Sequence, residues 1–162
     1  MPNDNYIIEE AVKLAREGVS VTLPVNGQSM LPFIVGGKES VILKAPGQVY
    51  KGLVMLAWAD NSRYVVHRVV GIDGDKVTLM GDGNLKGKEY CKLSDLKAEV
   101  THVVSADGKT RFLYTKKRMM AAKVWWYLRP IRRYLLFVLK LSARPKGALA
   151  TGGTQENEKM RY

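Results

Sequence analysis

The chain has 162 residues, of which 46% are hydrophobic, and a formal net charge of +11. This length and composition are those of an ordinary globular protein and predict one domain with a core of useful size. Its single cysteine, Cys91, excludes an intramolecular disulfide and a cysteine-rich zinc site.

The positive charge is concentrated at one end of the chain. Residues 1–108 carry 12 basic and 13 acidic side chains, whereas residues 109–162 carry 14 basic and two acidic ones. Such an asymmetry indicates an anionic partner, which could be a membrane surface, a nucleic acid or an acidic protein. A solvated basic helix without a partner would have the same composition.

The N-terminal segment, residues 1–18, predicts one amphipathic helix. Apolar residues recur at helical spacing, Asn3 or Asp4 can cap the start, and Gly18 can end the helix. The segment is acidic and lacks a basic stretch that leads into an apolar run, so we expect no N-terminal signal peptide.

Short β-branched or apolar runs, punctuated by glycine, aspartate and asparagine, follow this helix. The motif GIDGD at residues 71–75 predicts a hairpin turn between two of them. The spacing of the runs predicts a small, curled, mostly antiparallel β-domain over residues 19–115, so the fold class is mainly β. The predicted strands are residues 19–25, 40–45, 53–59, 63–70, 76–80, 98–106 and 110–115.

Residues 116–141 predict a basic, aromatic helix that Pro130 kinks or interrupts, and residues 142–162 have the composition of a flexible tail. The longest apolar run of the helix is too short to span a membrane. Its mixture of tryptophan and arginine is typical of a helix in the lipid headgroup region, so we expect a peripheral membrane or cytoplasmic protein. The alternatives are that its aromatic side chains pack on the β-domain or contact a partner protein. The residues predicted to contact a membrane are Trp125, Trp126, Arg129, Arg132, Arg133 and Phe137.

Two polar residues, Ser29 and His67, stand out within the β-domain. Ser29 lies in a turn with Gly27 before it and Pro32 after it, and a serine hydroxyl becomes a nucleophile only beside a base. Strand alternation places His67 on an apolar face, where a lone histidine is most simply a core residue. Its combination with the serine turn and with the later motif GDGN, residues 81–84, favours a catalytic site instead.

These motifs resemble those of the type I signal peptidases and their self-cleaving LexA-type relatives. The serine box of that family is here GQSMLP, the base box is HRVVGIDGD and the last box is GDGN, within about residues 20–105. Two boxes between them match loosely, since Lys38 and Leu53 stand where the family has aspartate. Bacterial members place lysine at the base position, so His67 resembles the endoplasmic-reticulum and archaeal-like members.

The resemblance implies a serine endopeptidase that cleaves after small residues in a leader or signal-like segment, with no cofactor and no metal. It implies Ser29 as nucleophile, His67 as general base and Asp82 as the group that orients the imidazole. The backbone N–H of Ser29 is the implied oxyanion donor. Members with a histidine base carry an acidic pair after the last box, where LKGKEY offers only Glu89, a poor substitute.

Three neighbours of the serine are assigned to substrate binding or support of the turn: Gln28, Met30 and Pro32. We expect Met30 to fill an apolar pocket that fixes the turn. His102 and Glu99 could ligate a metal, but no dense cluster of ligands accompanies them.

Two other functions remain open. A LexA-type self-cleaving regulator would need a DNA-binding domain, and residues 1–18 are too short for a helix-turn-helix. A non-catalytic module could use the basic C-terminal helix on lipid or nucleic acid, but the β-domain lacks the interleaved aromatic and basic residues of single-strand binders. We therefore expect a peptide or preprotein substrate, an anionic membrane surface as peripheral partner, and no nucleic acid.

Overall fold

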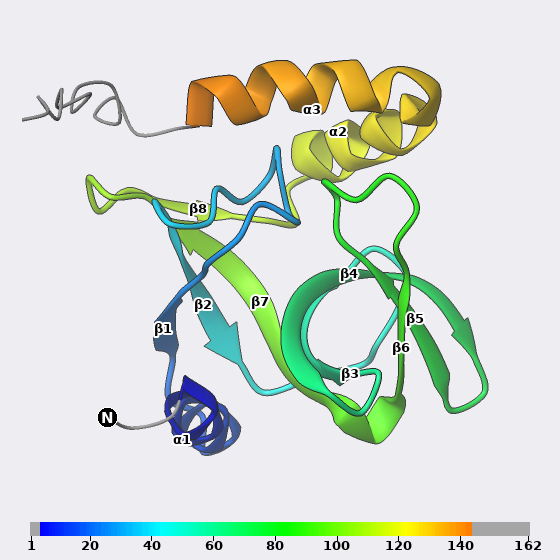
Figure 1. Ribbon diagram of the computed structural model, residues 1–162. Coiled ribbons are helices and arrows are strands. Elements are labelled where there is room, and N and C mark those ends of the chain that lie inside the picture. The colour runs from blue at the N-terminus through cyan, green and yellow to red at the C-terminus, as the bar shows by residue number, and fades with distance from the viewer. Residues whose placement is uncertain (1–3, 144–162) are drawn as a thin grey trace, which may run out of the picture.

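The computed structural model describes residues 4–143 and has three α-helices and eight strands in that range (Figure 1). Its architecture, a curled antiparallel sheet with an N-terminal helix and C-terminal helices, confirms the predicted mainly β fold class. Asn3 and residues 144–162 of the predicted tail lie outside the described residues. The elements are α1 (Asp4–Arg16), β1 (Val21–Pro24), β2 (Ser40–Lys44), β3 (Val54–Ala59), β4 (Arg63–Asp73), β5 (Lys76–Met80), β6 (Glu89–Lys92), a 3-10 turn (Leu93–Asp95), β7 (Leu96–Val104), β8 (Thr110–Phe112), α2 (Lys116–Tyr127) and α3 (Arg129–Ala143).

The strands form one antiparallel sheet in the order β1-β2-β7-β3-β4-β5-β6, and β8 pairs with β7. The eleven-residue strand β4 curls so that β3, β4, β5 and β6 enclose a ring (Figure 1). Asp73 pairs with Lys76, which leaves Gly74 (φ +55°) and Asp75 as a two-residue turn and confirms the predicted hairpin.

Two apolar clusters fill the β-domain. One lies under α1, β1, β2 and β7, and the other lies inside the ring. Tyr114 touches both clusters: its hydroxyl donates to Val100 O at 2.6 Å and accepts from the N–H of Val54 at 3.1 Å. The ring and the flatter part of the sheet are therefore tied together by a half-buried polar side chain.

The predicted C-terminal helix is two helices, α2 and α3, separated at Leu128. Pro130 is the second residue of α3, where its missing N–H removes no helical hydrogen bond, so it marks a helix start and not a kink. The pair covers the end of the sheet opposite α1 (Figure 1). Its contact with the β-domain is a third apolar cluster around Leu31, Trp125 and Leu136.

No helix within residues 4–143 combines the length and the hydropathy that a membrane span requires.

Candidate active site

Ser29 lies in a long connection between β1 and β2, residues 25–39, which we term the serine loop. The loop is closed at its base because the N–H of Gly37 donates to Val25 O at 2.8 Å. A helical turn follows the serine, where the N–H of Ile34 donates to Met30 O at 3.0 Å. Both Met30 and Ile34 are buried in the core, so the side chain of Met30 lies in apolar surroundings, and its role in fixing the turn stays a prediction.

The far end of the serine loop is held by an ion pair between Glu39 and Arg111. Their closest approach is 2.7 Å, from Nη1 of Arg111 to Oε1 of Glu39. Glu39 also accepts the N–H of Val35 at 2.8 Å, and Arg111 donates to Phe33 O at 3.2 Å. These contacts fix the backbone that follows the serine.

The GDGN motif, which we term the glycine loop, packs directly against the serine. The N–H of Gly83 donates to Ser29 O at 2.7 Å. A Cβ atom placed on Gly81 would lie 2.4 Å from Ser29 O, and one on Gly83 would lie 2.7 Å from Gln28 O. Both distances are too short for any side chain, so these two glycines permit the contact between the loops. The motif therefore sets the position of the backbone at Ser29.

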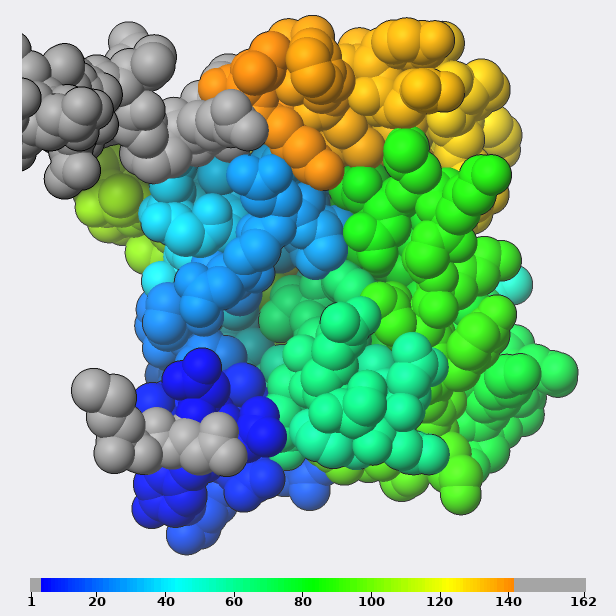
Figure 2. Space-filling view, viewed as in Figure 1, coloured from blue at the N-terminus to red at the C-terminus, as the bar shows by residue number. Residues whose placement is uncertain are grey.

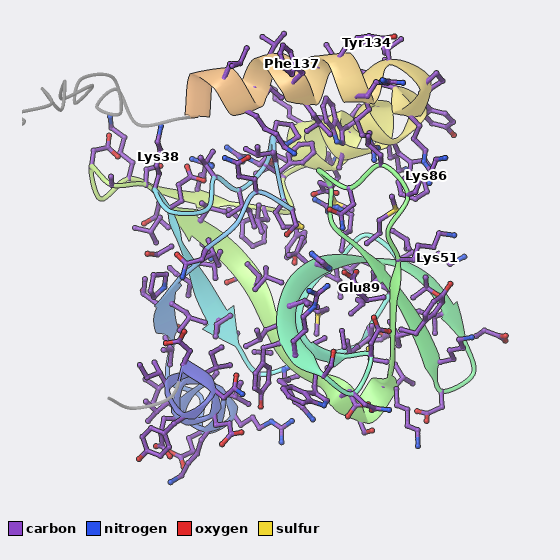
Figure 3. The ribbon with its side chains drawn as sticks, in the orientation of Figure 1. Lys38, Lys51, Lys86, Glu89, Tyr134 and Phe137 are labelled. Carbon is purple, nitrogen blue, oxygen red and sulfur yellow. The ribbon has the colours of Figure 1, made fainter. Side chains whose placement is uncertain are left out.

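His67 projects from β4 into the interior and contacts Glu89 of β6. Its Nδ1 lies 2.9 Å from Oε2 of Glu89, and both residues are buried, with exposed fractions of 4% and 6%. Arg63 donates to the other carboxylate oxygen at 3.3 Å. Figure 3 shows Glu89 within the ring of curled strands.

The protonation state of His67 suits a general base. Burial lowers the pKa of His67 from its ordinary value of 6.5, although the Glu89 carboxylate acts in the opposite direction. The imidazole is therefore mainly neutral at neutral pH. Glu89 at Nδ1 favours the tautomer that leaves Nε2 unprotonated and able to accept a proton.

Asp82, predicted to orient the imidazole, contacts Arg68 instead. Nε and Nη2 of Arg68 donate to its two carboxylate oxygens at 2.8 and 2.7 Å. Arg68 also donates to Gly52 O at 2.7 Å, so it ties the glycine loop to the turn before β3. The prediction for Asp82 is wrong because an arginine on the same strand as His67 occupies both oxygens, and Glu89 makes the contact with the imidazole.

Ser29 and His67 line one cavity of about 490 Å³, together with Glu89 and Arg63. Figure 2 shows the surface hollowed between the blue N-terminal segments and the green strands. Among the described residues, the Ser29 hydroxyl, the Ser29 N–H and Nε2 of His67 have no hydrogen-bond partner. They are therefore free to contact a substrate. Ser29 and His67 share no hydrogen bond in this structure, and catalytic hydrogen bonds often form or tighten only when substrate is bound.

Two strand edges without a neighbour in the described structure flank this cavity. Both the N–H and the C=O of Val69 bond toward β3, so by alternation those of Val66 and Tyr64 point away from β3. Pairing with β5 begins only at Arg68, which leaves this edge of β4 open. On the opposite wall, β1 pairs with β2 alone. An extended peptide could add to either edge.

The other predicted support residues have different positions. The side chain of Gln28 is exposed, and Pro32 lines a separate shallow groove, so neither is shown to line the cavity of Ser29. Burial raises the pKa of Cys91 to about 11, which makes it a poor nucleophile at neutral pH. Within residues 4–143, no group of three histidine, cysteine or carboxylate side chains could hold a metal ion.

Two of the predicted membrane-contact residues are buried against the glycine loop. Nε1 of Trp125 donates to Asp82 O at 2.7 Å, and Arg132, only 1% exposed, donates to Asn84 O at 3.2 Å and Trp125 O at 2.8 Å. The prediction that these two side chains contact a membrane is therefore wrong. The half-buried Trp126 lies under the guanidinium of Arg129, 4.5 Å from its ring centre.

Comparisons with models of protein families, with curated proteins and with solved structures returned no match for this chain. A curled antiparallel sheet does not by itself identify a superfamily. The resemblance to signal peptidases therefore rests on the sequence motifs, and the site has to be judged on its geometry.

Proposed function

We propose that this protein is a serine endopeptidase of signal-peptidase type whose catalytic unit is Ser29, His67 and Glu89. The observation that carries the proposal is the shared cavity. Ser29 and His67 lie on its wall, and a buried carboxylate holds the far nitrogen of the imidazole. A serine and a histidine in one cavity, with a buried carboxylate on the histidine, form one of the arrangements that catalyse acyl transfer by serine.

In the proposed reaction, Oγ of Ser29 attacks the carbonyl carbon of the scissile peptide bond and His67 takes the hydroxyl proton on Nε2. The free N–H of Ser29 donates to the oxyanion. His67 then protonates the leaving amine, and the C–N bond breaks to leave an acyl-enzyme. Water hydrolyses this ester in the second half of the reaction, with His67 again as base. Glu89 keeps the imidazole oriented and stabilises its transient positive charge.

The cavity supports a peptide as substrate. Open edges of β1 and β4 face each other across it, so an extended chain could bind by main-chain hydrogen bonds on either side. Its walls include the apolar side chains of Leu23, Met30 and Ile34. We propose cleavage after small residues, which the motif resemblance implies.

The test is an unbiased one. The full-length protein is incubated with a complex mixture of peptides, and new termini are identified by mass spectrometry. Ser29→Ala and His67→Ala variants serve as matched controls. We expect cuts after small residues with the wild-type protein and none with either variant. The same cuts in all three samples, or no cuts by the wild type, would contradict the proposal.

A further inference from the structure

The helix α3 carries three stripes of different chemistry along its length. One stripe faces the β-domain and includes Arg132, Leu136 and Leu139. The second stripe is basic and exposed, and consists of Arg129, Arg133 and Lys140. The third is apolar and 36–66% exposed, and we term it the outer face: Ile131, Tyr134, Leu135, Phe137, Val138 and Leu141.

The spacing explains this division. Residues 131, 134, 138 and 141 recur at intervals of three and four, so they lie on one side of the helix. Figure 3 shows Tyr134 and Phe137 on the side of α3 that points away from the domain. A run of large apolar side chains in water marks an interaction site. The outer face is therefore a surface that the described part of the protein does not cover.

The charges around the outer face identify what could cover it. The sequences of α2 and α3 contain eight basic residues and no acidic residue. The exposed basic stripe runs alongside the outer face, so an occupant must present an apolar layer next to negative charge. An anionic membrane interface has both. A second copy of this chain would bring like charges together.

We propose that the outer face of α3 docks into the headgroup region of an anionic membrane. The helix then lies in the plane of the interface, with Phe137 and Val138 toward the acyl chains and Arg133 and Lys140 near the lipid phosphates. Tyr134 has the amphipathic ring that is favoured at this depth. This docking does not depend on whether Ser29 is a nucleophile.

The experiment is sedimentation of the full-length protein with vesicles. One set contains phosphatidylcholine and phosphatidylglycerol in equal parts, and the other contains phosphatidylcholine alone. The test variant is Tyr134→Ser with Phe137→Ser. The control is Val19→Ser with Tyr50→Ser, two residues of 49% and 48% exposure far from α3 in the sequence. Both variants keep every charge of the chain.

We expect the wild type and the control variant to pellet with anionic vesicles and to stay in solution with neutral ones. The Tyr134/Phe137 variant should lose about tenfold in vesicle affinity, because apolar burial and charge attraction act together. Failure of the wild type to pellet would overturn the proposal. Unchanged pelleting of the test variant would overturn it too, since charge alone would then explain binding. A wild-type dimer that the test variant abolishes, without vesicle binding, would assign the outer face to a second copy.

Discussion

The two buried carboxylates near the site, Glu89 and Asp82, have different partners, and we expect them to have different roles. Glu89 contacts the imidazole of His67, whereas Asp82 is held by Arg68 through both oxygens. A carboxylate with a bidentate arginine has little capacity left for a second strong partner. We therefore expect Glu89→Gln and Asp82→Asn to have different effects on the cleavage rate and on its pH dependence.

The pH dependence of peptide cleavage tests this division. Since burial lowers the pKa of His67, kcat/KM should rise with pH through a midpoint below 6.5 and stay level to neutral pH. Glu89→Gln removes a charge that raises this pKa, so the midpoint should move further toward acid. The rate should also fall by about 10²–10⁴-fold as the imidazole loses its orientation.

Asp82→Asn is the matched control for that profile. It should move the pH midpoint toward acid by less than Glu89→Gln does, because the charge of Asp82 raises the pKa of His67 less than that of Glu89. The loss of the ion pair with Arg68 should lower the thermal midpoint of unfolding. If the midpoint of the pH profile moved further toward acid in Asp82→Asn than in Glu89→Gln, Asp82 and not Glu89 would be the residue that orients the imidazole.

Replacement of Gly83 tests whether the glycine loop positions Ser29. In Gly83→Ala the new Cβ would lie 2.7 Å from Gln28 O, so the serine loop must move. A shift of about 1 Å at a nucleophile costs about 10²-fold in rate. Gly87→Ala is the control, because its nearest neighbour is an atom of Asn84 at 3.8 Å. Equal kcat values for the two variants would show that the glycine loop does not position Ser29.

Among the elements, strand β6 shows what the sequence could and could not predict. Most strands and α1 were predictable because their apolar residues alternate or recur at helical spacing. The segment EYCK, residues 89–92, has no such pattern, so no strand is predicted there and Glu89 is taken only as a poor substitute for the orienting acid. Had it been taken as a strand, alternation would have placed Glu89 and Cys91 on the inner side, as observed. The pairing of Asp82 with Arg68 is a tertiary contact that no local pattern encodes.

The sequence also predicts the helices α2 and α3 only in part. Their aromatic and basic residues were predictable as amphipathic, but not which of them would face the domain. Burial of Arg132 requires carbonyl acceptors from the glycine loop and from α2, and these meet only in the folded chain. The remaining exposed residues form the outer face.

The link between α2 and the glycine loop can be measured as stability. Trp125→Phe removes the N–H that donates to Asp82 O and leaves a buried carbonyl unpaired, at a cost of about 1–3 kcal/mol. Trp126→Phe, at a half-buried position without a hydrogen bond to the described residues, should change the free energy of unfolding by about 0.5 kcal/mol or less. Urea unfolding of both variants gives the comparison. Equal losses would mean that the hydrogen bond to the glycine loop contributes nothing.

In the whole molecule, the site lies where three parts meet. The serine loop carries Ser29, the curled ring holds His67 and Glu89, and the α2–α3 pair supports the glycine loop from outside. The outer face of α3 lies on the side of the helix that points away from the domain (Figure 3).

We propose that Ser29 and His67 act as one catalytic unit. The decisive measurement is the rate at which a peptide with Ala-x-Ala before the scissile bond is cleaved by the wild type, Ser29→Ala, His67→Ala and the double variant. We predict that the wild type cleaves, and that each single change costs about as much as both together, since members of a catalytic unit are not additive. Wild-type activity in His67→Ala with an unchanged circular dichroism spectrum would contradict the account and leave Ser29 an ordinary loop hydroxyl.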